Sequence, residues 1–340
     1  MLITTFLLRL TRCENLSSLE AGELLECLLN GEATDVQIAA TLIALKTKGE
    51  TVEELAGLAE GMRRRAIPIK SNHQRFIDTA GTGSSCAKTF NVSTAAAFVI
   101  AGAGLPVAKH GNRAASSRCG SADVLTALGV NVSASPETSE KCLNEIGLCF
   151  MFAPLYHTAT ARVAAIRREL GVQTTFNLLG PLTNPARAPR QIIGVWHRDL
   201  VEPMARVLAA LGTERAWVVH GNDGLDEVTI ADSTFVAEAR NGQARAFEIV
   251  PESFGLERAS IQHLSGGDAQ GNATIIREVL TRQRDDEARS LVIANAAAAL
   301  HVGGSALDLH VGTQMANESI DSGRANQILD DLIRITNASA

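Results

Sequence analysis

The sequence predicts an α/β protein that combines an all-helical N-terminal unit with a larger unit built on a parallel sheet flanked by helices. Two observations carry this prediction. Helix-start patterns repeat within the first seventy or so residues, and after Pro68 short apolar runs alternate with longer helical ones. The chain has 340 residues, of which 46% are hydrophobic, so it can bury a large core and is expected to divide into two domains.

The helix-start patterns are capping boxes, in which Ser or Thr is followed three residues later by Glu or Gln. They are Ser17 with Glu20, Thr34 with Gln37, and Thr51 with Glu54. Gly31 and Gly49 stand where two of these helices should end, and Pro68 closes the segment. We expect mainly packing roles for these residues, although the apolar helix faces leave a subunit contact open.

Candidate strands follow as short apolar runs, each ending in a glycine, proline or polar turn. They are residues 76–79, 105–108, 148–152, 191–196 and 216–220. Ligands of parallel sheets bind at the carboxyl ends of the strands, so the loops after these runs should hold the chemistry.

The composition excludes several classes of protein. A formal net charge of -6 opposes a broad nucleic-acid footprint, so an anionic ligand would need a local pocket. The cysteines show neither a Cys-x-x-Cys pair nor zinc-type spacing, and we expect reduced, mostly buried thiols. The apolar run 1–10 is too short to cross a bilayer and lacks a basic start and a cleavage site, so we expect a cytoplasmic protein.

A glycine-rich loop follows the first candidate strand. Residues 78–85 read Asp-Thr-Ala-Gly-Thr-Gly-Ser-Ser, and a helix should begin near Asn91 and Ser93. Glycines can turn backbone N–H groups toward an anion, and a helix N-terminus adds donors, so the loop could bind phosphate. A short glycine loop alone is weak evidence, and Asn91 or Ser93 could simply cap the helix. Neither a Walker loop nor the dinucleotide fingerprint is present.

Two further loops concentrate polar groups. After the second strand, residues 109–113 and 116–123 supply cations and hydroxyls that suit a pyrophosphate and a ribose, although Ser121 could equally cap a helix. After the fifth strand, Asp226 and Glu227 form an adjacent carboxylate pair suited to Mg²⁺. An acidic surface turn is the alternative that spacing leaves open.

At this point the motifs match a known family. They are residues 31–34 and 48–50, the Gly81 loop, the Lys109 loop, the run 176–185 (Phe-Asn-Leu-Leu-Gly-Pro-Leu-Thr-Asn-Pro), the Asp226 and Glu227 pair, and residues 266–268. The chain resembles the anthranilate phosphoribosyltransferase family over nearly its whole length. The resemblance implies a fold of the nucleoside phosphorylase and phosphoribosyltransferase type, with a small helical domain and a large mixed, mainly parallel sheet domain.

The resemblance also implies an organisation. We expect residues 1–72 to form the helical domain, joined by a segment near 172–190, and residues 73–340 to form the α/β domain that binds phosphoribosyl pyrophosphate (PRPP). The substrate site would lie between the domains, with Mg²⁺ as cofactor. Two chains would form a homodimer through the helical domain.

Site residues follow from the same resemblance. Those implied for PRPP are Gly81, Thr82, Gly83, Ser84, Thr89, Asn91, Ser93, Thr94, Lys109, His110, Gly111, Asn112 and Ser121. Those implied for anthranilate are Gly81, His110, Asn112, His157, Arg167 and Pro181. Those implied for the metal are Ser93, Asp226 and Glu227.

The implied reaction belongs to tryptophan biosynthesis. The amine of anthranilate displaces pyrophosphate from the anomeric carbon of PRPP, and positioning and leaving-group stabilisation should dominate because an aryl amine is a poor nucleophile. Lys109 and Arg167 would be the catalytic residues, Lys109 on the departing pyrophosphate and Arg167 on the anthranilate carboxylate. Without the resemblance, a surface salt bridge on the helix 158–170 would be the preferred role of Arg167.

The sequence departs from the family pattern at the edges of the site. Ser84 and Ser85 replace the usual Gly-Asp, Thr158 and Thr160 replace Pro and Met, and Gln173 stands where Arg is common. Two alternatives fit the chain less well: a pyrimidine nucleoside phosphorylase-like enzyme, whose Lys-x-Ser-Thr-Gly-Gly loop is missing here, and a non-catalytic relative that binds nucleic acid, which the charge of -6 and the retained carboxylates oppose.

Overall fold

A computed structural model describes residues 2–83, 87, 89–114 and 119–338. Its centre is a seven-stranded sheet in the order β3-β2-β1-β4-β5-β6-β7. The strands are β1 Ile77–Gly81, β2 Val107–Gly111, β3 Leu148–Phe152, β4 Arg190–Gly194, β5 Arg215–Gly221, β6 Thr234–Arg240 and β7 Gln243–Ile249. The first five pair in parallel, whereas β6 and β7 are antiparallel additions, so the predicted mixed, mainly parallel α/β fold is confirmed.

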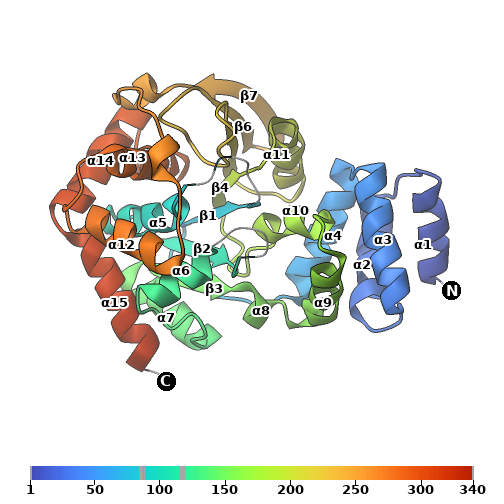
Figure 1. The fold of residues 1–340 in the computed structure, drawn as a ribbon. Coiled ribbons are helices and arrows are strands. Elements are labelled where there is room, and N and C mark those ends of the chain that lie inside the picture. Colours follow the sequence, from blue (N-terminus) through green and yellow to red (C-terminus); the bar gives the residue numbers. More distant parts are fainter. Residues whose placement is uncertain (1, 84–86, 88, 115–118, 339–340) are drawn as a thin grey trace.

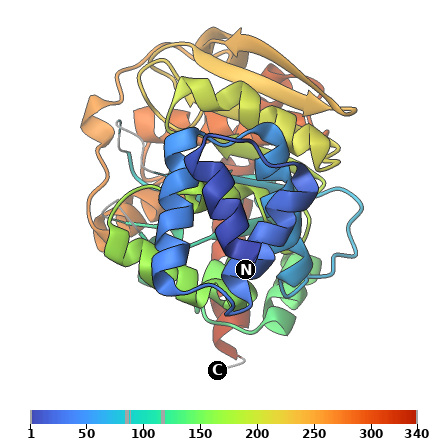
Figure 2. The same cartoon turned by 90° about the vertical axis from the view of Figure 1, so that its right-hand side faces the viewer.

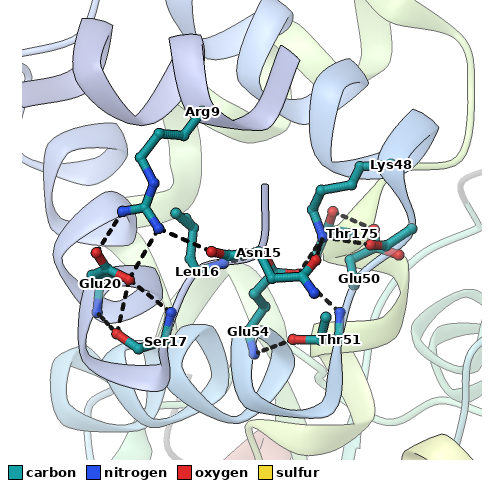
Figure 3. A network of polar contacts seen from close by, with 11 residues as sticks. Arg9, Asn15, Leu16, Ser17, Glu20, Lys48, Glu50, Thr51, Glu54 and Thr175 are labelled. Carbon is teal, nitrogen blue, oxygen red and sulfur yellow. Dashed lines mark hydrogen bonds and ion pairs between the residues drawn. The ribbon is translucent and has the colours of Figure 1, made fainter. Parts of the chain in front are cut away.

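The N-terminal helices are α1 Leu2–Thr11, α2 Ser18–Leu29, α3 Asp35–Lys48 and α4 Val52–Arg65. Figure 1 shows them as a bundle at one side of the sheet, and Figure 2 shows the bundle face-on in front of it. All three predicted capping boxes are present, with the Ser17 and Thr51 boxes drawn in Figure 3. Gly49 is the C-cap of α3 as predicted, whereas the C-cap of α2 is Asn30 and Gly31 follows it; both glycines have positive φ.

Eleven further α-helices are found in the described residues. They are α5 Val92–Gly102, α6 Ser121–Ala127, α7 Pro136–Ile146, α8 Ala153–Tyr156, α9 Ala161–Leu170, α10 Thr175–Leu182, α11 Val201–Ala210, α12 Ala269–Leu280, α13 Glu287–Val302, α14 Leu309–Asp321 and α15 Arg324–Ala338. Short 3-10 turns cover Thr158–Thr160, Arg198–Leu200, Pro251–Phe254 and Gln262–Leu264. No helix in the described part of the chain is long and apolar enough to cross a membrane.

The chain returns to the helical bundle after β3. Helix α9 packs on α3, and α10 packs on α4. Arg63 of α4 fixes α10 further, because its Nε donates to the carbonyl of Leu182 at 2.7 Å. The segment that carries Arg167 is therefore held by the bundle.

The central strands β4 and β5 are buried on both faces of the sheet, and their sequences show why. Ile192 of β4 packs in one core and Ile193 in the other, and Val219 and Val218 of β5 alternate in the same way. Side chains that alternate along a strand point to opposite faces. One core lies against α5 and α13, whereas the other continues through α11 into the helical bundle.

The ends of β1, β4 and β5 differ from the expected strands by one or two residues, and three further differences have structural reasons. The second strand begins at Val107, two residues late, because residues 103 and 104 form the turn that leaves α5 and residues 105 and 106 connect this turn to the strand. The helix expected over 158–170 starts with a 3-10 turn and becomes α-helical only at Ala161. Ser121 does not cap α6; the cap is Gly120, and Ser121 is the first helical residue.

Candidate active site

The carboxyl ends of β1, β2, β4 and β5 open into a cavity of about 360 Å³. Most of the predicted site residues line it: Gly81, Thr82, Gly83, Thr89, Asn91, Ser93, Thr94, Lys109, His110, Gly111, Asn112, Ser121, Arg167, Pro181, Asp226 and Glu227. Ser84 lies outside the described residues. His157 does not line the cavity but sits behind it, with its ring centroid 5.1 Å from that of His110.

Lys109 projects from β2 into the floor of the cavity. Its Nζ donates to the carbonyl of Thr79, and lies 3.3 Å from Thr79 Oγ1 and 3.4 Å from Ser93 Oγ. The side chain is almost fully buried, and this burial lowers the pKa of the ammonium to about 8. Its hydrogen-bond partners are neutral oxygens, and the nearby Asp78 and Glu227 carboxyls oppose the lowering of its pKa. A bound anion would gain a charge-assisted contact with the ammonium.

Glu227 faces Lys109 across the start of α5. The backbone N–H of Ser93 donates to Glu227 Oε1 at 3.1 Å, while Oε2 is buried without a partner among the described atoms. Burial and the neighbouring Asp226 carboxylate raise the pKa of Glu227 to about 8. A carboxylate oxygen that is buried and unsatisfied in this way is suited to a cation.

The Asp226 turn is held by glycines at two strand ends. A Cβ at Gly194 would lie 1.6 Å from the Asp226 carbonyl oxygen, so β4 must end in glycine for the turn to approach. A Cβ at Gly81 would lie 3.7 Å from Asp226 Oδ2, which places the carboxylate beside the glycine loop. Asp226, Glu227 and the Ser93 hydroxyl thus present hard oxygen atoms, and Mg²⁺ takes one or two carboxylates together with water and substrate phosphates. The residues present fit a magnesium site.

The loop after β2 folds back onto α6. The carbonyl of Asn112 accepts hydrogen bonds from Ser121 Oγ at 3.3 Å and from the Ala122 N–H at 3.2 Å. A Cβ at Gly111 would lie 2.2 Å from Ser121 Oγ, so glycine is required for this closure. The polar groups of two separate loops consequently meet at one wall of the cavity.

Arg167 reaches the cavity from α9 and is held by the run that follows. Its Nε donates to Thr174 Oγ1 at 3.0 Å and its Nη2 to Asn177 Oδ1 at 3.0 Å, while the guanidinium lies 5.4 Å from the Phe176 ring centroid. Among the described residues it forms no ion pair, so the surface salt bridge considered as its alternative role is wrong. Burial lowers the pKa of the guanidinium.

His110 and His157 lie between the cavity and the core. The ring Nδ1 of His110 is 3.1 Å from the carbonyl of Gly180, and its backbone N–H donates to Asp78 Oδ1 at 3.1 Å. Burial lowers the pKa of His110 to about 3 and that of His157 to about 4, so both rings are neutral near pH 7. Because both rings are neutral, they add no positive charge to this wall that could compete with Lys109 or Arg167 for an anion.

Sequence reasoning missed a set of positioning contacts. Asn91 is the N-cap of α5, yet its side chain makes no capping bond. Instead its Nδ2 donates to the carbonyl of Cys119 at 3.3 Å, and its Oδ1 accepts from Asn272 Nδ2 at 3.0 Å. Asn272 Oδ1 in turn accepts from the Gly267 N–H at 2.8 Å. The glycines at 266 and 267 marked this region, but nothing in the spacing pointed to Asn272.

Other residues also line the cavity without having been named as site residues, although Thr79, Ala80, Arg113, Cys119 and Gly120 belong to the loops singled out in the sequence. These other lining residues are Thr79, Ala80, Ala87, Phe90, Ala96, Arg113, Ala114, Cys119, Gly120, Ala153, Phe176, Asn177, Gly180, Ile192, Gly194, Val219 and Asn295. Phe176, Asn177 and Gly180 belong to a run that the resemblance had marked as a whole. Asn295 is helical and distant in sequence, and its amide bonds the backbone of Val228 next to the carboxylate pair.

Comparison with known proteins identifies the family. Residues 73–326 match the glycosyl transferase family a/b domain, and residues 4–66 match the helical bundle domain of the same family. An anthranilate phosphoribosyltransferase of Moorella thermoacetica is 53% identical over 287 residues, which is 84% of both chains. One from Acetivibrio thermocellus is 46% identical over 330 residues, or 97% of this chain and 95% of the relative.

Solved structures give the same result. The anthranilate phosphoribosyltransferase of Thermus thermophilus superposes with a TM-score of 0.92 at 39% identity, covering 97% of this chain and 99% of that one. The Saccharomyces cerevisiae enzyme in complex with PRPP and Mg superposes with a TM-score of 0.90 at 27% identity, covering 99% and 98%. The fold, the cavity and these relatives together show that the chain belongs to the anthranilate phosphoribosyltransferase family.

Proposed function

We propose that this protein is a magnesium-dependent phosphoribosyltransferase that transfers the 5-phosphoribosyl group of PRPP to the amine of anthranilate, with release of pyrophosphate, in tryptophan biosynthesis. One observation carries the proposal: the cavity places a buried lysine and a carboxylate pair opposite an arginine that has no ion-pair partner among the described residues. Identities of 53% and 46% to anthranilate phosphoribosyltransferases favour it over a nucleoside phosphorylase or a nucleic-acid-binding relative.

The sugar donor would lie along the glycine loop and the start of α5. The Gly83 N–H and the Thr94 hydroxyl, which has no hydrogen-bond partner among the described atoms, would donate to phosphate oxygens. The N–H groups of Thr82 and Ser93 already donate to the Gly194 carbonyl and to Glu227. Lys109 would place its ammonium on the departing pyrophosphate, where charge develops during the reaction. Mg²⁺ held by Asp226, Glu227 and Ser93 would supply further neutralisation of the pyrophosphate charge.

Anthranilate would lie between Asn112, Pro181 and Arg167. The Arg167 guanidinium is already fixed by Thr174 and Asn177, so little side-chain freedom is lost when a carboxylate binds. The neutral rings of His110 and His157 would border the acceptor path without attracting its carboxylate. The amine then faces the anomeric carbon, and the arrangement needs no covalent intermediate.

Several expectations about organisation belong to the same proposal. A domain division at residues 72 and 73 is supported by the family matches at 4–66 and 73–326. A joining segment near 172–190 is supported by the packing of α10 on α4. Dimerisation through the helical domain is supported by exposed apolar side chains on α1 to α3, among them Leu8 at 55%, Leu19 at 75% and Val36 at 79% exposure.

A cytoplasmic location agrees with thiols that form no disulfide, at Cys13, Cys27, Cys142 and Cys149.

The activity can be tested by the loss of anthranilate fluorescence. Purified protein is mixed with anthranilate, PRPP and Mg²⁺, and the fluorescence is followed over time. We expect a decrease that requires all three additions and stops with EDTA. A stable signal under conditions in which a known anthranilate phosphoribosyltransferase is active would overturn the proposal.

A further inference from the structure

A second hollow lies at the edge of the sheet opposite the active-site cavity. It is formed where β4 and β5 begin and where the antiparallel β6 ends. Its lining residues include the arginines Arg75, Arg190, Arg215 and Arg240, with Glu214 as the one acidic side chain among them. Such a concentration of positive charge stands out in a protein whose net charge is -6.

Strand register places three of these arginines in a row. Arg190 of β4 pairs directly with Arg215 of β5, and Arg215 pairs directly with Arg240 of β6. Neighbouring strands are about 4.8 Å apart, and residues directly opposite each other share one face of a sheet. Like charges in such positions repel, so the row carries an electrostatic cost unless something neutralises it.

The protein itself neutralises the row only in part. Arg215 pairs with Glu238 at 2.6 Å and donates to the carbonyl of His301 at 2.9 Å. Arg190 donates from Nη1 to the carbonyl of Gly303 at 2.5 Å, but its Nε is buried without a hydrogen-bond partner in the described structure. The nearest carboxylate to that Nε belongs to Glu214 at 3.6 Å, and its side chain is 58% exposed.

The other two arginines are available to take a ligand. Arg75 and Arg240 are exposed, and neither forms an ion pair or side-chain hydrogen bond with a described residue. Arg75 comes from the loop before β1, whereas Arg240 is the third member of the row, at the hairpin end of β6, and both line the hollow. The hollow therefore offers unused N–H donors around a common space.

We propose that this arginine pocket binds a phosphate group, as the free ion or on a small phosphorylated solute. Guanidinium groups form paired, charge-assisted hydrogen bonds to phosphate, and a tetrahedral phosphate can accept from several of them at once. The buried Nε of Arg190 would gain an acceptor, and the repulsion along the row would fall. This site is separate from the proposed catalytic cavity and does not depend on the reaction assigned to it.

Equilibrium binding to inorganic phosphate tests the proposal. We expect the full-length protein to show two classes of phosphate site, one in each hollow, in a calorimetric titration without Mg²⁺. Arg240→Gln and Arg75→Gln should each weaken one class about tenfold or more and leave the other unchanged. Arg12→Gln is the matched control, because Arg12 is also exposed and makes no side-chain contact in the described structure.

The same titration with ribose 5-phosphate identifies the source of the phosphate group. Tighter binding than inorganic phosphate at the arginine-dependent class would assign the site to phosphorylated solutes, and equal or weaker binding would assign it to the free ion. All three substituted side chains are exposed, so we expect unchanged circular dichroism and unchanged initial rates. Titrations of Arg240→Gln and Arg75→Gln that match Arg12→Gln would overturn the proposal, whether the wild type shows one class of site or two.

Discussion

Glu54 shows how one buried carboxylate can organise a helical bundle. Its side chain is fully buried, and Oε1 accepts from the Leu16 N–H at 2.9 Å. Oε2 accepts from the Thr51 N–H and from Lys48 Nζ, both at 2.8 Å (Figure 3). The residue that completes the capping box of α4 thus also ties down the loop before α2 and the end of α3.

Lys48→Met should be strongly destabilising. It removes the ammonium and leaves the Glu54 charge buried without its cation, a change that costs about 3–5 kcal/mol in comparable pairs. The free energy of unfolding in urea measures the effect. As the matched control, Arg206→Met breaks an exposed pair with Glu202, and we expect a loss of about 1 kcal/mol or less. Similar losses in the two variants would contradict the role assigned to the buried pair.

Arg167→Ala separates the two substrates of the proposed reaction. The side chain bonds only neutral groups of the run that follows it, which leaves its charge available for the anthranilate carboxylate. Losing a charge-assisted contact costs about 1.5–3 kcal/mol, so we expect the KM for anthranilate to rise roughly 10- to 100-fold. The KM for PRPP should change little. Steady-state kinetics with each substrate varied would contradict this role if both constants rose equally.

Site residues could be predicted from the sequence where the residue type itself, such as a lysine or a carboxylate, indicates a chemical role. Lys109 and the pair Asp226 and Glu227 carry charges that follow the strands expected from the sequence, and the structure brings all three to one cavity. Asn272 and Asn295 could not be found in this way. They lie within helices far along the chain, and their amides act through tertiary contacts that no local spacing reveals.

At the scale of elements, the end of β4 sets the position of the carboxylate pair. Thr82 donates its N–H to the carbonyl of Gly194 at 2.9 Å, so the glycine loop and the Asp226 turn meet at the same residue. Gly194→Ala would push a methyl group into the Asp226 carbonyl oxygen. We expect the Mg²⁺ concentration for half-maximal activity to rise about tenfold or more, because displaced ligands lose affinity.

A second glycine provides the control for this prediction. A Cβ at Gly267 would meet no atom within 4 Å, and its φ is not in the left-handed region. Gly267→Ala should therefore leave the magnesium requirement within about twofold of the wild type, because nothing has to move. Titration of activity with Mg²⁺ measures both variants. An equal shift in the two would show that the effect is not specific to the Asp226 turn.

Helices and strands with a regular spacing of apolar residues are predictable from the sequence. The β6–β7 hairpin, by contrast, was not predicted. Its turn holds Asn241 and Gly242, both with positive φ, and this dipeptide is a strong hairpin pattern. The pattern is present, but β7 exposes most of its side chains and lacks an apolar run that would mark it as a strand. The five parallel strands are buried on one or both faces and all match candidate strands, with boundaries displaced by three residues or fewer.

Across the whole molecule, the helical bundle and the substrate site are mechanically linked. The Thr175 hydroxyl donates to Glu50 at 2.5 Å, which joins the loop after α3 to the first residue of α10 (Figure 3). The next residues of α10 hold Arg167, and its far end is tied to Arg63. The wall of the cavity that carries Arg167 thus depends on the bundle, whereas the wall that carries Lys109 depends on the sheet.

Buried titratable groups near the cavity pull the stability of the whole protein in opposite directions. Burial lowers the pKa values of His110 and His157 far below 6.5, so the unfolded chain takes up protons first and stability falls with falling pH. Burial raises the pKa of Asp78 from 3.8 to about 6 and that of Glu227 from 4.5 to about 8. For these carboxyls the folded chain takes up protons first, so stability rises as pH falls through the same range.

Removing one buried histidine should therefore change the pH dependence of the free energy of unfolding. In His157→Phe the unfolded chain no longer gains that proton, so relative to the wild type the variant should become more stable by about 2 kcal/mol between pH 7 and pH 5. The constant cost of repacking the ring cancels in this comparison, because only the change with pH is used. Urea unfolding at both pH values measures it, with His197→Phe as the control at a side chain that is 63% exposed. If both variants follow the same pH dependence, burial of His157 does not control the acid stability of the fold.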